Sequence, residues 1–113
     1  AFFRTKINSD NVSYEHGFGT ASGDVFGIYD YNESQYRFRI DKTGKVGIGT
    51  RWPNEMLHVK HSDEDVYMKL ETNQNNAFLQ TQSNSHKYGL GTAQDDFGVY
   101  DYNSEAYRFK IKI

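Results

Sequence analysis

The 113-residue chain contains almost the same aromatic segment twice, and this duplication constrains its fold more than any other feature. FGIYDYN at 26–32 returns as FGVYDYN at 97–103, and YRFRI at 36–40 returns as YRFKI at 107–111. The repeat period of about seventy residues is longer than the units of solenoids and propellers. The sequence therefore predicts two similar modules instead of a long array of small repeats.

Each copy alternates apolar and polar residues with a period of two. Tyr36, Phe38 and Ile40 alternate with two arginines, so we expect these three side chains to share one face of a strand. NESQ at 32–35 has the composition of a hairpin loop, and DKTG at 41–44 has that of a further turn. Short strands separated by frequent turns predict an all-β fold.

The segment SDEDVYMKLET at 62–72 carries signals for both a helix and a strand. Its first four residues resemble a capping box, which begins a helix. Its centre, VYMKL, alternates as a strand does, and NQNN follows soon afterwards. We favour a strand over 62–72.

The chain is poor in the residues that build a core. Leu, Ile, Val and Phe together make up 24 of the 113 residues, close to the level at which chains fail to fold. A single copy would be marginally stable for this reason. We therefore expect several subunits to share one core.

Composition also excludes several classes of partner. The formal net charge of −2 provides no basic face, so we expect no nucleic acid partner. No apolar run approaches the length of about eighteen residues that a membrane span needs, so we expect no membrane insertion. The absence of cysteine excludes disulfides and thiolate metal sites and leaves the compartment open.

The glycine-rich stretches GIGT and GFGTASG invite comparison with phosphate-binding loops. Such a loop needs a following helix whose N-terminal amides face the anion, and the sequence predicts a turn after one stretch and a strand after the other. We interpret these glycines as positions where neighbouring backbones approach closely.

Two histidines precede an acidic stretch. His58 and His61 are three residues apart, so on a strand their rings would point to opposite faces. We expect a solvated acidic turn here, with no metal and no cofactor. Histidines gathered from three subunits around a threefold axis remain an alternative.

Candidate catalytic residues are few. Asp30 and Asp101 each lie between two tyrosines, at equivalent positions of the two copies, as residues of a structural turn would. Glycoside cleavage needs two carboxylates at a defined separation, and the sequence identifies no such pair. We do not expect an enzyme.

Aromatic residues carry the strongest binding signal. They make up 16% of the chain, with nine tyrosines, and tyrosine combines an apolar ring with a hydroxyl group suited to recognition. In the first copy we favour packing as their role. In the second copy packing and sugar binding stay open, with candidate ligand contacts at Tyr100, Asp101, Tyr102, Asn103 and Tyr107.

The connector between the copies, KVGIGTRWPNEMLHVK, is the most specific stretch. It resembles the pattern V-G-I-G-T-x-x-P-x-x-x-L-H-V of trimeric fibres of the bacteriophage tail-fibre and tailspike type. Trp52 departs from the pattern, which usually has a small or polar residue there. Trp52 is therefore a further ligand-binding candidate, with wedging between modules as the alternative.

The resemblance implies an intertwined, β-rich homotrimeric fibre of two repeated β-hairpin modules. We expect a shaft-proximal module at 1–44, a connector at 45–61 and a fibre-tip module at 62–113. Such fibres often carry a C-terminal intramolecular chaperone of the endosialidase type that cleaves itself off. The chain stops where the first copy continues with DKTGKVGIGT, as a mature tip would after chaperone release.

The predicted function is that of a trimeric fibre-tip adhesin. Its partners would be two further copies of the chain and a cell-surface glycan or another envelope receptor. The location would be extracellular, on a virion tail fibre or a bacterial surface fibre. A purely structural shaft segment and a glycan depolymerase are the alternatives.

Overall fold

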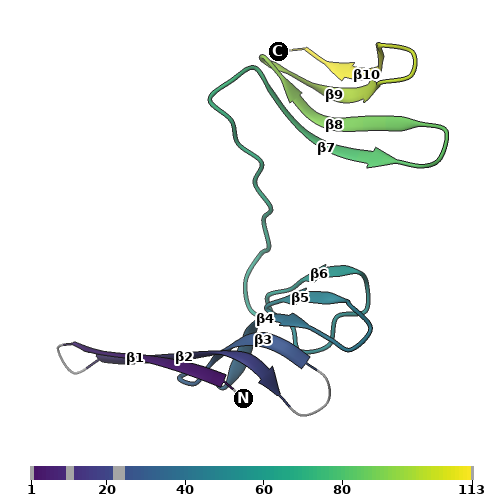
Figure 1. The fold of residues 1–113 in the computed structure, drawn as a ribbon. Helices are drawn as coiled ribbons and strands as arrows, with labels where there is room; N and C mark the ends of the chain where they lie inside the picture. Colours follow the sequence, from purple (N-terminus) through teal and green to yellow (C-terminus); the bar gives the residue numbers. More distant parts are fainter. Residues whose placement is uncertain (1, 10–11, 22–24, 113) are drawn as a thin grey trace. The chain divides into compact units, whose positions relative to one another are not determined.

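The computed structural model describes residues 2–9, 12–21 and 25–112 and confirms the all-β class (Figure 1). The described residues form two sheets and no helix, and therefore no helix that could cross a membrane. The strands are β1 (Phe2–Ser9), β2 (Val12–Ala21), β3 (Val25–Asp30), β4 (Gln35–Ile40), β5 (Val46–Ile48), β6 (Leu57–Val59), β7 (Asn76–Gln82), β8 (Lys87–Ala93), β9 (Asp96–Asp101) and β10 (Ala106–Ile111).

The chain divides into two compact units, Ala1–Val66 and Tyr67–Ile113. The first unit holds a six-stranded sheet in which β1 to β6 lie in sequence order. Its neighbours pair antiparallel except β5 and β6, which are parallel. The second unit holds a four-stranded antiparallel sheet in which β7 to β10 also lie in sequence order.

The hairpin predicted around 32–35 is present in the first unit, and its counterpart is present in the second. Turn residues 31–34 join β3 to β4, and residues 102–105 join β9 to β10. Each hairpin contains a register shift just beyond its turn, between Ile28 and Tyr29 in β3 and between Tyr107 and Phe109 in β10.

This register shift corrects one expectation. Tyr36 pairs with Tyr29, whereas Phe38 pairs with Ile28. Because adjacent residues of a strand point to opposite faces, Tyr36 lies on the face opposite to Phe38. The prediction that Tyr36, Phe38 and Ile40 share one face is therefore wrong for Tyr36, since simple alternation does not account for a bulge.

Glycines let the strands approach closely, as the sequence indicated. A Cβ atom added at Gly27 or Gly98 would collide with the backbone oxygen of Phe38 or Phe109, respectively. In the GIGT stretch, Gly49 has a φ of 72°, and a Cβ atom there would collide with the Lys60 carbonyl. No helix follows GIGT, so its described geometry matches the close-approach interpretation.

One face of each sheet carries a row of apolar side chains. In the first sheet the strand pairing aligns Phe18, Ile28, Phe38, Ile48 and Val59. In the second sheet it aligns Leu79, Leu90, Val99 and Phe109. We call these surfaces the apolar faces.

The apolar faces are largely uncovered. Among the described residues only one hydrophobic side chain is buried, that of Val25 at 5% exposure, whereas Phe109 is 55% exposed. Phe18, Ile28, Ile48, Leu79 and Leu90 are exposed as well. A single chain therefore leaves most of its large apolar groups in contact with water.

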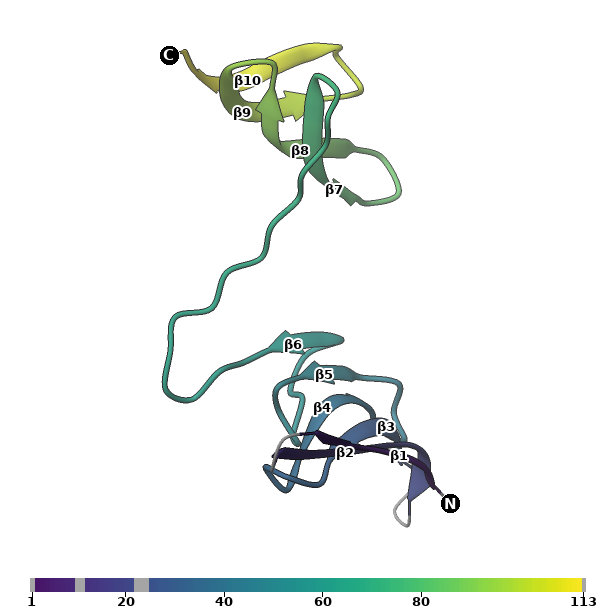
Figure 2. The ribbon, with the colours of Figure 1, turned by 90° about the vertical axis from the view of Figure 1, so that its left-hand side faces the viewer.

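The prediction of a strand over 62–72 is wrong for the single chain. Figure 2 shows the path between β6 and β7, in which the described residues form neither strand nor helix. Tyr67, Met68 and Leu70 are all exposed there. Alternating apolar and polar residues suit an extended strand, but a strand forms only where a neighbouring strand pairs with it.

Candidate ligand-binding site on the second sheet

Three of the predicted site residues come together on the second sheet. The ring of Tyr100 meets that of Tyr102 edge-on at 5.0 Å between centroids and that of Tyr107 at 5.1 Å. Phe78 lies on the far side of Tyr100 at 6.5 Å, with its ring nearly parallel. Such edge-on and offset geometries are the favourable ones for aromatic pairs, so the cluster holds its own shape.

Strand register explains how the cluster forms. Tyr107 pairs with Tyr100, and Gly89 of β8 lies directly between Tyr100 and Gln80 of β7. A Cβ atom at Gly89 would lie only 3.1 Å from the Tyr102 ring and 3.3 Å from that of Phe78. The missing side chain therefore lets the rings of neighbouring strands close over β8.

The cluster surrounds an open hollow of about 590 Å³, which we call the tyrosine hollow. Its lining residues are Asn76, Phe78, Gln80, Tyr100, Tyr102 and Tyr107. The Gln80 side-chain amide donates a hydrogen bond to the Tyr102 hydroxyl at 3.0 Å. The hollow therefore combines ring faces with amide and hydroxyl groups, which suits a ligand that is apolar on one side and hydroxylated around its edge.

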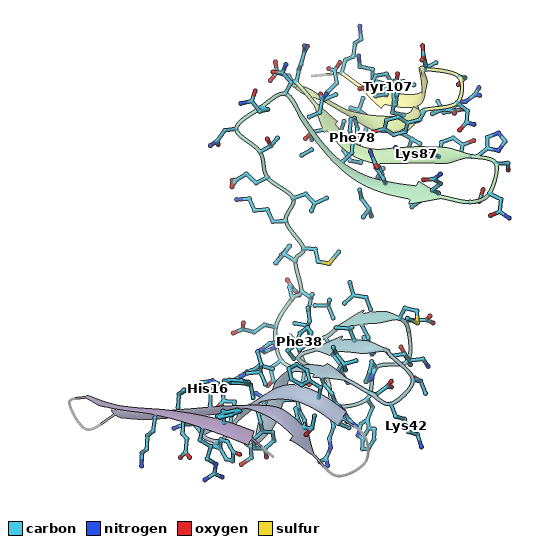
Figure 3. All side chains as sticks on the ribbon, viewed as in Figure 1. His16, Phe38, Lys42, Phe78, Lys87 and Tyr107 are labelled. Carbon is cyan, nitrogen blue, oxygen red and sulfur yellow. The ribbon has the colours of Figure 1, made fainter. Side chains whose placement is uncertain are left out.

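Two lysines lie over the tyrosine rings. Lys87 Nζ is 4.5 Å from the centroid of the Tyr102 ring, and Lys110 Nζ is 4.9 Å from that of Tyr107. Figure 3 shows Phe78, Lys87 and Tyr107 on the second sheet, from three different strands. Lys110 also pairs with Asp96 at 2.6 Å, and this hydrogen bond raises the pKa of Lys110.

The Asp101 side chain stabilises the turn after β9 and does not line the hollow. This side chain is 1% exposed, and Oδ2 accepts a hydrogen bond from Arg108 Nε at 2.8 Å and forms an ion pair with Arg108 Nη2 at 2.7 Å. Its Oδ1 accepts from the backbone N–H groups of Asn103 and Ser104. Burial opposes ionisation, but these hydrogen bonds outweigh it and lower the pKa of Asp101 to about 2.

Asn103 joins two loops. Its Oδ1 accepts a hydrogen bond from the Lys87 backbone at 2.9 Å, and its Nδ2 donates to the Ser85 carbonyl at the same distance. The turn after β9 is thereby attached to the loop before β8. The Asn103 side chain thus holds Tyr102 beside β8.

Trp52 belongs to the first unit, so it is not part of this cluster. Its side chain is 71% exposed. The guanidinium groups of Arg39 and Arg51 lie 5.0 and 5.4 Å from the Trp52 ring, and Arg39 donates a hydrogen bond to the Arg51 carbonyl. Trp52 therefore has packing partners in the connector and an accessible ring.

The equivalent surface of the first sheet is covered. The guanidinium of Arg4 lies 3.9 Å over the Tyr31 ring and forms an ion pair with Glu15 at 3.3 Å. The contact with Tyr31 raises the pKa of Arg4. A hollow beside Tyr29 and Tyr36 measures about 120 Å³.

The histidines of the connector have separate partners. His58 Nδ1 accepts a hydrogen bond from the Asn54 backbone, while His61 Nδ1 accepts from those of Asp63 and Glu64. Within the part of the chain that the structure describes, no three His, Asp or Glu side chains form a metal-binding group.

No known protein family, curated protein or solved structure matches this chain.

Sequence reasoning missed the contribution of β7. Asn76, Phe78 and Gln80 line the hollow but were not among the candidate residues. One signal was present, since AFLQT at 77–81 resembles AFFRT at 1–5, which marks this segment as part of the repeat.

Proposed function

We propose that this chain is the ligand-binding module of a homotrimeric surface fibre and that it recognises a cell-surface glycan or another envelope receptor. The observation that carries the proposal is the tyrosine hollow, which presents several aromatic rings beside two side-chain amides. The V-G-I-G-T resemblance of the connector supports an extracellular location, on a virion tail fibre or a bacterial surface fibre.

The chemistry of the hollow suits a sugar ring. A pyranose has an apolar C–H face, which packs on an aromatic ring, and hydroxyl groups around its edge, which need hydrogen-bonding partners. Tyr100 and Tyr107 provide ring surface, while Asn76 and Gln80 provide amide groups at the edge. Both requirements are met within one sheet.

Among the predicted site residues, Tyr100, Tyr102 and Tyr107 would contact the ligand directly. Asp101 and Asn103 would act indirectly, because their side chains are engaged in holding the turn that carries Tyr102. Trp52 would form a separate contact in the connector, since its ring is accessible.

The apolar faces support assembly into a homotrimer. Their exposed Phe, Leu and Ile side chains would be stabilised by burial against further copies of the chain, at about 25 cal/mol per Å² of apolar surface. Two repeated β-hairpin modules, at 1–44 and 62–113, would then lie along the fibre axis with the connector at 45–61. Three equivalent hollows would gain avidity on a polyvalent cell surface.

The state of Asp101 supports binding without catalysis. A glycosidase acid needs a raised pKa, whereas Arg108 and two backbone amides lower the pKa of Asp101 to about 2. A depolymerase would release reducing ends from capsule or lipopolysaccharide, and we expect none.

A glycan array of envelope oligosaccharides tests the proposal, with the chain tested in its assembled form. Tyr102→Ala should weaken binding by about tenfold, which corresponds to a loss of about 1.4 kcal/mol. The matched control is Tyr31→Ala, which removes the equivalent ring of the first sheet, where Arg4 covers it. A purely structural shaft segment predicts that neither substitution affects binding to any saccharide or to cells.

A further inference from the structure

We infer that the ligand of the tyrosine hollow is an acidic saccharide, whose carboxylate or phosphate group is bound by Lys87. This inference rests on the proposed function, because it specifies the ligand of the same site. It distinguishes acidic from neutral sugars, which the aromatic rings alone do not do.

The position of Lys87 is the first argument. Lys87 Nζ lies 4.5 Å from the centroid of the Tyr102 ring, and Tyr102 lines the hollow. The Tyr102 backbone donates a hydrogen bond to the Lys87 carbonyl at 3.0 Å, which fixes the two residues side by side. The ammonium group therefore lies over the Tyr102 ring, next to the hollow that this ring lines.

The charge balance at the hollow is the second argument. Lys110, which lies over Tyr107, forms an ion pair with Asp96 at 2.6 Å and is neutralised by it. Among the described residues, no carboxylate lies within ion-pair distance of Lys87 Nζ. Lys87 is therefore an uncompensated positive charge beside an aromatic surface, and an anionic substituent on the ligand would complete the pair.

The first sheet provides an internal comparison. Its residue equivalent to Lys87 is Glu15, which pairs with Arg4 at 3.3 Å while Arg4 covers Tyr31. In the second sheet Gln80 replaces Arg4, and Lys87 replaces Glu15. The two substitutions together place a lysine in place of an arginine over the tyrosine ring and remove the carboxylate beside it, as a site for an anion requires.

Binding to paired oligosaccharides tests the inference. The probes are uronic-acid oligosaccharides with their carboxyl-reduced forms, and phosphorylated oligosaccharides with their dephosphorylated forms. We expect at least about fivefold tighter binding of one acidic form over its neutral counterpart, with a preference that declines between 50 and 500 mM salt because a partly exposed ion pair is screened. The pair that shows the preference identifies the carboxylate or the phosphate.

Three variants assign that preference to Lys87. Lys87→Gln should remove the preference for the acidic form, whereas Lys87→Arg should retain it. Lys42→Gln is the matched control, because it makes the same charge change at an exposed turn of the first unit (Figure 3).

Each contrary result is distinct. Equal binding of acidic and neutral forms overturns this inference while the sugar-binding function stands. An acidic preference that survives in Lys87→Gln overturns the assignment to Lys87. Binding to none of the saccharides overturns the proposed function, and the inference with it.

Discussion

Arg108 binds one carboxylate oxygen of Asp101 through a hydrogen bond from Nε at 2.8 Å and an ion pair from Nη2 at 2.7 Å. Arg37 and Asp30 make the same pair in the first unit, at 2.8 and 2.6 Å. Each aspartate also accepts backbone hydrogen bonds from its following turn. The duplicated sequence thus encodes a duplicated polar lock, which closes the hairpin that carries the tyrosines.

Asp101→Asn should destabilise the second unit. The substitution removes the charge that Arg108 binds while leaving the side-chain shape unchanged, and the remaining amide cannot accept as strongly from the N–H groups of Arg108, Asn103 and Ser104. We expect the midpoint of thermal unfolding to fall by on the order of 5 °C, as followed by circular dichroism. An unchanged midpoint in Asp101→Asn would show that the lock contributes nothing to stability.

Acid should weaken the fold over a defined range of pH. The pKa of Asp101 is about 2 in the folded chain, below its usual value near 3.9, so the folded state favours the ionised carboxylate. The resulting stability is fully present above about pH 4 and is lost as the pH falls towards 2. The pKa of Asp30 is lowered as well, so both units should respond.

Unfolding midpoints in urea between pH 7 and pH 2 measure this dependence. The Asp101→Asn variant should show a shallower decline below pH 4 than the unchanged chain, because one of the titrating groups has been removed. Parallel curves for the two proteins would contradict the assignment to Asp101.

The sequence predicted the features that depend on neighbouring residues and missed those that depend on how strands pair. Alternation of apolar and polar residues predicted the short strands and the all-β class, because residues two apart on a strand share a face. It failed for Tyr36 relative to Phe38, because a bulge lies between them. The contribution of Gln80 depends on the register of β7 on β8, and no local pattern fixes that register.

The prediction of a strand over 62–72 was wrong for a similar reason. Val66, Met68 and Leu70 alternate, but a strand exists only where a second strand pairs with it. Among the described residues, no strand pairs with this segment. The alternation of side chains can predict one extended segment. Whether a second strand pairs with that segment depends on the whole chain or on the assembly.

Gly98→Ala should be strongly destabilising, because it places a methyl group against the backbone of β10. The added Cβ atom would collide with the Phe109 carbonyl, and a backbone cannot move aside as a flexible side chain does. We expect a loss of about 1–3 kcal/mol in the free energy of unfolding, measured by urea titration. Thr92→Ala, at an exposed position of the neighbouring strand, is the control and should be nearly neutral.

The proposed homotrimer predicts that the purified chain has the mass of three copies. Multi-angle light scattering measures this directly, and a stable single copy at micromolar concentration would contradict the shared core. Leu90→Glu places a charge in the middle of the apolar row of the second sheet and should dissociate or aggregate the assembly. Gln94→Glu makes the same charge change at an exposed turn and should leave the mass unchanged.

The first sheet also specifies how the hollow of the second could be closed. Gln80→Arg combined with Lys87→Glu would reproduce the ion pair that Arg4 and Glu15 form at 3.3 Å, with the new guanidinium over Tyr102. The first sheet accommodates this arrangement, so the double variant should keep its circular dichroism spectrum and its mass. It should nevertheless lose saccharide binding by about tenfold or more, because the stacking surface is covered and the charge reversed. Undiminished binding in a correctly folded double variant would place the ligand elsewhere on the chain.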